Sequence, residues 1–397
     1  MSRVPAVRFK GFTDPWEQRK LGEMAEIVGG GTPNTGVESY WDGDIDWYSP
    51  AELGAQIYAD CSVRKITKAG YDSCSATLLP ANTTILFTSR AGIGNTAILR
   101  RSACTNQGFQ SLVVNDDADV YFVYSMTNKI KKFAEQQASG STFLEISGKG
   151  LAVGEFAFPS KDEQIRIGVF FQKFDSLITL HQRKYDKLCT IKKSMLDKMF
   201  PRPGELVPEI RFEGFTDPWE QRKLKDLSTI STGFPFESTS FSDDGEYLVI
   251  TNGNILAEEQ YVLPYGGNKI SLEHELIEQY GLNVGDVLVT MDGEVGRTAK
   301  VADERMVLAQ RVGRLIAKND PEFLYQWLNT GSFSRSMINI ARGGTIKHIS
   351  LAEIGAFEGV APHDQNEIEK IGFFFRNMDH LITLHQRKHD QYYALMR

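Results

Sequence analysis

Apolar side chains recur with a helical period in two long stretches of the chain. In the first stretch the seam positions lie alternately four and three residues apart, and they are Phe170, Phe174, Leu177, His181, Lys184, Leu188, Ile191 and Met195. In the second stretch the positions of the same phase are Phe374, Met378, Leu381, His385, Lys388, Tyr392 and Leu395. This spacing predicts two coiled-coil helices with a polar interruption at the same place, and equal seams of this kind are expected to pair antiparallel.

The rest of the chain has the pattern of two globular domains. Short apolar runs such as Thr83–Ser89 and Asp286–Met291 alternate with glycine-rich turns and helical patches, which predicts an α+β fold for each domain. The fold class is therefore α+β, with two globular domains and two long helices that form an antiparallel coiled coil in a pseudo-two-fold internal repeat. The predicted boundaries are 1–160 for the first domain, 161–200 for the central helix, 201–218 for a linker, 219–362 for the second domain and 363–397 for the final helix.

An internal duplication explains why these elements occur twice. Residues Arg8–Leu21 read RFKGFTDPWEQRKL, and residues Arg211–Leu224 differ from them at one position. The segment LITLHQRK occurs at Leu177–Lys184 and again, unchanged, at Leu381–Lys388. Identical segments are expected to do identical work, such as docking two copies of one partner.

The interiors of the two repeats have diverged. Residues 33–80 and 236–282 share little, although Leu86–Ala97 still resembles Leu288–Ala299. The divergent interiors are therefore expected to read two different ligands on one scaffold. The alternative is a recent partial duplication without functional meaning. The final helix is expected to be the shorter of the two.

Composition and charge narrow the class of protein. Of 397 residues, 41% are apolar and 24% charged, as in ordinary globular proteins, and no apolar stretch has the length of a membrane-spanning helix. The four cysteines form no CxxC pair and the N-terminus has no apolar signal segment, so a reducing cytoplasm is expected. The net charge of −7 argues against a small basic nucleic-acid-binding module, but permits a larger protein with a local basic surface.

The sequence contains no recognisable motif for catalysis or metal binding. Ser147–Gly150 lacks the spacing of a phosphate-binding P-loop, and Gly29–Gly31 lacks the strand-then-helix setting of a dinucleotide-binding turn. Neither an HExxH zinc motif nor an Asn-Pro-Pro-aromatic methyltransferase motif occurs. A binding protein is favoured over an enzyme, with no cofactor or metal expected in this chain.

Side chains suited to reading DNA cluster near the glycine-rich turns of both domains. Arg, Asn and Gln hydrogen-bond to base edges, and glycine lets a backbone approach a phosphate closely. The candidates are Arg90, Asn95, Arg100, Arg101 and Gln107 in the first domain and Arg297, Lys300, Gln310, Arg311 and Arg314 in the second. The plain alternative is that about half of them are ordinary surface charges.

The duplicated segments supply the candidates for docking a partner. Trp16 and Trp219 stand in identical contexts, and Trp is enriched at interface hot spots because it brings a large area and a donor. The same two side chains are equally suited to sealing each domain against its adjacent helix, and a His in a helical seam is usually a packed polar residue. The docking candidates are Trp16, Arg19, His181, Arg183, Trp219, Arg222, His385 and Arg387.

With GFTDPWEQRKL and LITLHQRK each present twice, the whole chain resembles the specificity subunit of type I restriction–modification systems. The resemblance implies a cytoplasmic, non-enzymatic DNA reader in phage defence. Each target-recognition domain would read one half of a split, asymmetric sequence in double-stranded DNA, and the helices would set the spacer. The family also implies two docked modification subunits, which use S-adenosylmethionine to methylate adenine, and up to two restriction subunits, which use ATP and Mg²⁺.

Three other interpretations of the sequence stay open. The chain could be a stand-alone sequence-specific DNA-binding protein that needs no partner. It could be an adaptor whose coiled coil recruits partners without DNA. It could also be an unrecognised enzyme, such as a fused methyltransferase.

Overall fold

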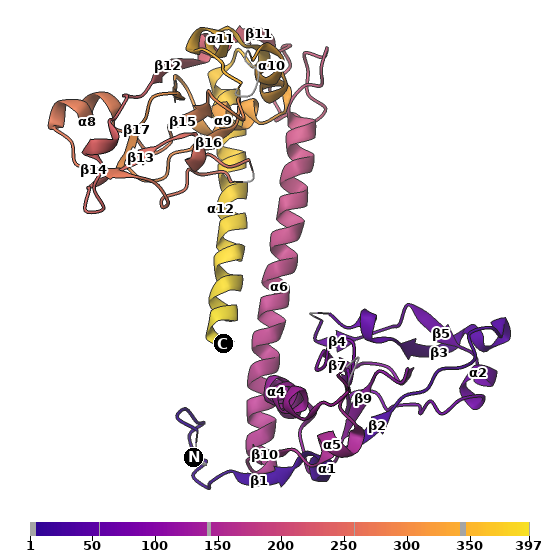
Figure 1. Ribbon diagram of the computed structural model, residues 1–397. Coiled ribbons are helices and arrows are strands. Elements are labelled where there is room, and N and C mark those ends of the chain that lie inside the picture. Colours follow the sequence, from indigo (N-terminus) through magenta and orange to yellow (C-terminus); the bar gives the residue numbers. More distant parts are fainter. Residues whose placement is uncertain (1–4, 55, 141–143, 258, 342–346, 397) are drawn as a thin grey trace. The chain divides into compact units, whose positions relative to one another are not determined.

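A computed structural model describes residues 5–54, 56–140, 144–257, 259–341 and 347–396 (Figure 1). The chain forms two compact units, one of residues 1–179 with 392–397 and one of residues 180–391. Each unit contains an α+β domain and part of the long helices, as the sequence predicts. Within the described residues, no helix is long and apolar enough to cross a membrane.

The first unit is built on a five-stranded sheet beside a smaller one. In spatial order the large sheet contains β2 (Ala25–Gly29), β9 (Gln110–Val114), β6 (Thr84–Phe87), β7 (Thr96–Leu99) and β4 (Tyr58–Ala59). The small sheet contains β5 (Arg64–Ile66), β3 (Trp41–Tyr48) and β8 (Ala103–Thr105). The helices of this domain are α1 (Leu21–Met24), α2 (Lys68–Asp72), α3 (Val120–Ser125), α4 (Thr127–Gln137) and α5 (Gly148–Ala152).

The second unit repeats this scaffold. Its larger sheet has the order β12 (Ser228–Thr232), β18 (Val312–Ala317), β15 (Val287–Thr290) and β16 (Thr298–Lys300). Its smaller sheet has the order β14 (Lys269–Ile270), β13 (Tyr247–Ile250) and β17 (Met306–Leu308). Its helices are α7 (Leu224–Leu227), α8 (His274–Tyr280), α9 (Pro321–Leu328), α10 (Ser332–Ile340) and α11 (Leu351–Ala356). In both small sheets the central strand runs parallel to the last one, so the two domains share one topology.

The duplicated RF-GFTDPWEQRKL segments join each domain to a long helix. Their EQRK residues form β1 (Glu17–Lys20) and β11 (Glu220–Lys223). These strands pair antiparallel with β10 (Glu155–Phe158) and β19 (Glu358–Ala361), which lie just before the two long helices. Two segments far apart in sequence are thereby fixed at the start of each helix.

The first residue of each duplicated segment anchors it to the helix. Arg8 donates two hydrogen bonds of 2.7 Å to Glu163, and Arg211 donates two of 2.6 and 2.8 Å to Glu367. Both glutamates are buried, with side chains 0% and 1% exposed. A bidentate pair of this kind fixes orientation as well as distance. The duplication is therefore used to build the same joint twice.

Both long helices predicted from the seams are present. They are α6 (Lys161–Met199) and α12 (Gln365–Met396). Each contains a glycine near its start, where the carboxylate that caps a domain helix packs closely. A Cβ at Gly168 would lie 2.2 Å from the nearest oxygen of that carboxylate, and a Cβ at Gly372 would lie 2.0 Å from its counterpart. Glycine is used here for close packing of the domain on the helix, not as a helix breaker.

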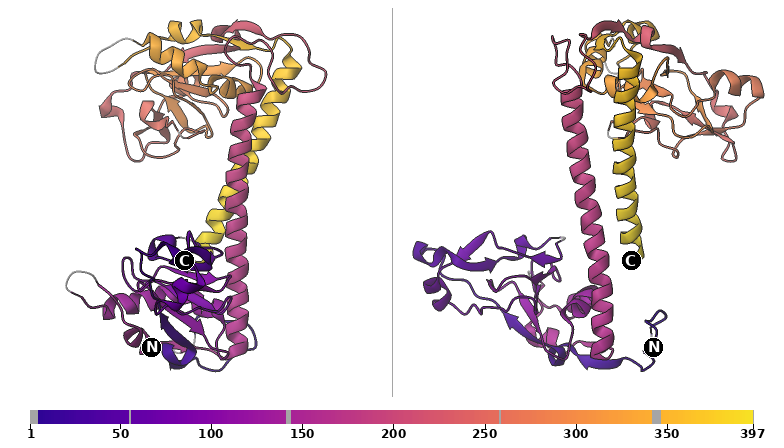
Figure 2. Two further views of the ribbon diagram at one scale, coloured as in Figure 1. Left: turned by 90° about the vertical axis from the view of Figure 1, so that its right-hand side faces the viewer. Right: turned by 180° about the vertical axis from the view of Figure 1, so that it is seen from behind.

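Within the second unit, residues 180–199 of α6 run antiparallel beside α12 (Figures 1 and 2). Lys192 Nζ lies 2.6 Å from Asp379 Oδ1, and His181 Nδ1 lies 2.8 Å from His385 Nδ1. The residue numbers therefore fall along α6 in the direction in which they rise along α12. The antiparallel coiled coil is confirmed, and its polar interruption is a pair formed by the two histidines of the duplicated LITLHQRK segments.

Candidate functional site

A hairpin with the same backbone geometry occurs in both domains, where the sequence places its DNA-reading candidates. It joins β6 to β7 in the first unit and β15 to β16 in the second. The amide of Gly94 donates to the carbonyl oxygen of Thr88 at 2.9 Å, and the amide of Gly296 donates to that of Thr290 at 3.0 Å. Both glycines have positive φ, +84° and +81°, which other residues rarely adopt. The faint sequence similarity around these turns therefore marks one structural device that both domains share.

Eight of the ten DNA-reading candidates reach the surface of their domain. Five are exposed and three are half-buried, in this order: Arg100, Arg101, Gln107, Gln310 and Arg311, then Arg90, Asn95 and Arg297. Several are held by neighbours. The Arg100 guanidinium lies 3.8 Å from the ring centre of Tyr58, and Gln107 accepts a 2.7 Å hydrogen bond from Thr32. Thr32 follows the Gly29–Gly31 turn, which is therefore brought next to the candidate surface.

The structure places the remaining two candidates, Lys300 and Arg314, inside the second domain. The Arg314 side chain is 8% exposed and its guanidinium lies 2.6 Å from Asp286. The Lys300 side chain is 5% exposed, and its Nζ lies 2.5 Å from Glu322 and 3.8 Å from Asp379. Both cations neutralise buried carboxylates. Their assignment as DNA-reading residues is corrected, because neither charge is presented to a ligand.

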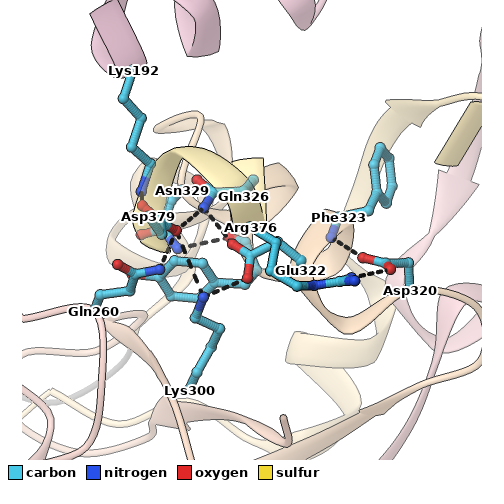
Figure 3. Close-up of polar contacts among 11 residues, drawn as sticks. Lys192, Gln260, Lys300, Asp320, Glu322, Phe323, Gln326, Asn329, Arg376 and Asp379 are labelled. Atoms are coloured by element: carbon cyan, nitrogen blue, oxygen red, sulfur yellow. Dashed lines mark hydrogen bonds and ion pairs between the residues drawn. The ribbon is translucent and has the colours of Figure 1, made fainter. Parts of the chain in front are cut away.

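A buried polar network around Lys300 ties the second domain to both long helices (Figure 3). Lys192 Nζ of α6 lies 2.6 Å from the Oδ1 atom of Asp379 in α12. Gln326 of α9 donates to Glu322 at 2.6 Å and to Asp379 at 3.3 Å. Two lysines thus balance two carboxylates, and an amide connects them. In the sequence, Lys192 and Asp379 each directly follow a seam position of the predicted helices, Ile191 and Met378, and a search for surface chemistry does not single them out.

The equivalent position of the first unit is built differently. Asp175 of α6 takes the repeat position of Asp379, and it accepts a hydrogen bond from the Tyr121 hydroxyl. Ile98 takes the strand position of Lys300, and no Lys or Arg among the described residues forms an ion pair with Asp175. Burial raises the pKa of Asp175, while the hydrogen bond from Tyr121 opposes that rise. At this position the second unit uses ion pairs, and the first uses a hydrogen bond from a neutral hydroxyl.

The two tryptophans of the docking prediction lie in different surroundings. Trp219 is 1% exposed, packs against Phe200 and Phe323, and donates from Nε1 to Glu367 at 3.3 Å. It belongs to the core of the second unit, so its assignment as a contact for a partner is corrected. Trp16 is half-buried and packs edge-on against Phe122, with ring centres 5.8 Å apart.

The paired seam histidines occupy the interior of the helix pair rather than a docking surface. Burial, together with the nearby charges of Lys184 and Lys388, lowers the pKa of both His181 and His385. Of the four arginines in the docking set, Arg183 and Arg387 are exposed, and Arg19 and Arg222 are half-buried.

An exposed apolar stripe lies at matching positions of both long helices. Val169 and Leu177 of α6 are 42% and 36% exposed, and Phe373 and Leu381 of α12 are 61% and 41% exposed. The seam pattern predicts Leu177 and Leu381 to be inside, which is wrong by this measure. In the second unit the stripe lines a groove of about 900 Å³ together with Phe212, Lys370 and other residues.

Comparison with known proteins finds relatives that extend over both repeats. The family model described as "Type I restriction modification DNA specificity domain" matches residues 13–189 and 216–391. The MjaIX specificity subunit of a type I restriction enzyme from Methanocaldococcus jannaschii is 30% identical over 237 residues, 55% of this chain. That match spans 52%, about half, of the relative's own length.

Two further similarities cover nearly the whole chain. The MjaVIII specificity subunit of the same organism is 23% identical over 397 residues, 95% of this chain and 89% of that one. The crystal structure of a type I restriction-modification system S subunit from M. genitalium covers 100% of this chain and 96% of its own, with a TM-score of 0.65. At 13% identity, this second similarity concerns the fold alone.

Proposed function

Because the chain belongs to the family of type I restriction–modification DNA specificity domains, we propose that it reads a split, asymmetric sequence in double-stranded DNA. Each recognition domain reads one half, and the two long helices set the spacer between the halves. The chain itself carries out no catalytic step and acts in the cytoplasm. Methylation and cleavage belong to partner subunits, which bring S-adenosylmethionine, ATP and Mg²⁺.

One observation supports this proposal: the two domains have the same scaffold but different polar side chains, half-buried or exposed, on it. The hairpins have matching backbone hydrogen bonds, yet Arg90 and Asn95 of the first are replaced by Asp292 and Arg297 in the second. Exposed Arg, Asn, Asp and Gln side chains are those that distinguish base pairs in the major groove. Reading two different half-sites requires one scaffold that carries different polar side chains in the two domains.

The duplicated surface supports the docking of two copies of one partner. Val169 with Leu177 and Phe373 with Leu381 present the same apolar stripe twice, with Arg183 or Arg387 exposed on the same helices. Large exposed apolar side chains that recur at fixed positions indicate an interface. We assign these stripes to two modification subunits, with up to two restriction subunits joining the complex afterwards.

Selection from a random-sequence duplex library tests the DNA-reading function. The full chain is mixed with a modification subunit, bound duplexes are sequenced, and the selection is repeated without the partner. A bipartite motif recovered with the partner supports the proposal. A pool without any preferred sequence contradicts it, and an equally tight bipartite motif without the partner favours a stand-alone DNA-binding protein.

Substitution of the apolar stripe tests the docking surface. Leu381→Asp is expected to weaken one partner site by about 2 kcal/mol or more, roughly 30-fold in affinity, if this position is a hot spot. Val284→Asp is the matched control, since Val284 is 60% exposed in the same unit but lies in a loop of the domain. Sedimentation should then show one partner copy per chain for the first variant and two for the control. Equal loss in both variants, or in neither, argues against this surface.

A further inference from the structure

Each hairpin carries a charged side chain that faces a side chain of opposite charge on a neighbouring loop, and the signs of the two charges are exchanged between the domains. In each domain a residue just after the hairpin's first strand accepts a backbone hydrogen bond from the segment before the next helix. Ile146 N donates to Ser89 O at 3.1 Å, and Ile349 N donates to Met291 O at 3.0 Å. The next hairpin residue and the preceding loop residue are therefore equivalent in the two domains. They are Arg90 with Glu145 in the first and Asp292 with His348 in the second.

The side chains at these equivalent positions face one another in both domains. The Arg90 guanidinium lies 3.8 Å from the Glu145 carboxylate, and the side chains are 42% and 41% exposed. In the second domain His348 Nδ1 lies 2.5 Å from one oxygen of Asp292, and Arg311 lies 3.0 Å from the other. His348 and Arg311 are 48% and 59% exposed, whereas Asp292 is 18% exposed. The hairpin supplies the cation in one domain and the anion in the other.

In the first domain the fold does not depend on this pair for its stability, because an ion pair exposed to this degree contributes between about 0 and 1 kcal/mol. The glycines of the turns allow the backbone to come close to another molecule, since Gly92 and Gly293 have φ of +103° and +72° and no neighbour crowds the second. Charged side chains on the same backbone turn, with opposite sign in the two domains, are suited to contact with a ligand.

We propose that these pairs are specificity-determining residues that read the corresponding base pair in each half-site. This inference rests on the proposed DNA-reading function. An arginine donates to the O6 and N7 atoms of guanine, whereas a carboxylate accepts from the amino group of cytosine. The first domain presents Arg90 from the hairpin and Glu145 from the loop. The second presents Asp292 from the hairpin, with His348 and Arg311 beside it, so the two half-sites differ in base preference at this position.

The test is the duplex selection with the full chain and a modification subunit, repeated with charge variants. The exchange Arg90→Glu with Glu145→Arg keeps the ion pair and reverses its direction. It is expected to change the preferred base at one position of one half-site and to leave the other half-site unchanged. Arg90→Ala alone should lower discrimination at that position by about 5- to 150-fold. Asp292→Asn should alter the other half-site.

The control and the outcomes separate this inference from the proposed function. Lys68→Asp with Asp72→Lys exchanges another exposed ion pair of the first domain, on α2, and should leave the motif intact. A wild-type motif that persists in the Arg90 variants, with binding retained and melting temperature unchanged, overturns the inference and leaves the function standing. A change in both half-sites also overturns it. Absence of any motif with the wild-type chain contradicts the proposed function itself.

Discussion

Asp379 and Asp175 occupy equivalent positions of the two repeats, yet replacement by asparagine is expected to destabilise the protein at Asp379 and not at Asp175. Asp379 is 5% exposed and lies near Lys192 and Lys300. Asparagine would leave both ammonium groups buried with one carboxylate, Glu322, to share. Removing one partner of a buried ion pair costs about 3–5 kcal/mol. Because Glu322 stays 2.5 Å from Lys300, we expect the lower end, about 3 kcal/mol.

Asp175 has no such cation to lose. Its pKa is raised by burial above the ordinary value of 3.8. A carboxyl with a raised pKa in the folded state contributes its stability fully below that ordinary value, and the contribution is lost as the pH rises through the folded pKa. At pH 7 the ionised group is therefore unfavourable in the folded state. Asparagine carries no charge and still accepts the Tyr121 hydroxyl, so Asp175→Asn is expected to leave stability unchanged or to increase it.

Hydrogen exchange in increasing urea measures the two effects separately, one in each compact unit. Peptides from α9 report on the second unit and peptides from α3 on the first. Asp303→Asn is the control, since Asp303 is an exposed partner of Arg305, and it should change the free energy of unfolding by less than about 0.5 kcal/mol. Equal destabilisation by Asp379→Asn and Asp175→Asn would refute the reasoning, because it would mean that the surrounding charges do not decide the effect.

Three further predictions concern single joints of the fold. Trp219→Ala is expected to cost about 3–5 kcal/mol in urea unfolding because the ring is fully buried, and a smaller effect than for half-buried Trp16→Ala would contradict this. The pKa values of His181 and His385 are lowered, so the stability they contribute is present above pH 6.5 and is lost as the pH falls. Replacing both by Gln should flatten the decline in melting temperature between about pH 7 and pH 5.5, and an unchanged decline would contradict the assignment. Gly372→Ala should cost about 1–3 kcal/mol, since its Cβ would meet the capping carboxylate of α9, and an unchanged melt would show that the helices can separate there.

The two long helices and the repeated scaffold could be predicted from the sequence, because each produces a regular or repeated pattern of residues. The alternating spacing of four and three residues between apolar positions identifies the helices. The repeated segments show that the domain and its long helix each occur twice. The predicted starts, residues 161 and 363, lie within two residues of the observed ones, Lys161 and Gln365. The sequence does not show why Gly168 and Gly372 stand inside the helices, which is that a domain helix packs against them without space for a side chain.

The candidate site was harder to predict because burial is decided by tertiary contacts. Lys300 and Arg314 have the residue types of a DNA surface, and only the fold shows that each has a buried carboxylate beside it. Trp16 and Trp219 have identical neighbours in sequence and pack on equivalent phenylalanines, Phe122 and Phe323, yet they differ in burial. Phe200, at the junction after α6, packs on Trp219. The contact of the hairpins with a distant loop has no local signal either, since Arg90 and Glu145 are 55 residues apart in sequence.

The arrangement of charges at the second joint is compatible with independent change of the recognition domain. Lys192 and Asp379 both belong to the long helices and lie 2.6 Å apart, so they neutralise each other within the helix pair. Lys300 and Glu322 both belong to the domain and lie 2.5 Å apart. Each of these two pairs is balanced on its own side of the joint. The contacts across it are hydrogen bonds from Gln260 and Gln326 to Asp379, the longer approach of Lys300 to Asp379, and the pair of Arg376 with Asp320, in which Arg376 is 51% exposed. A different domain on the same helices would therefore leave no uncompensated buried charge behind, which is the electrostatic condition for a frame that stays constant while its DNA-reading parts diverge.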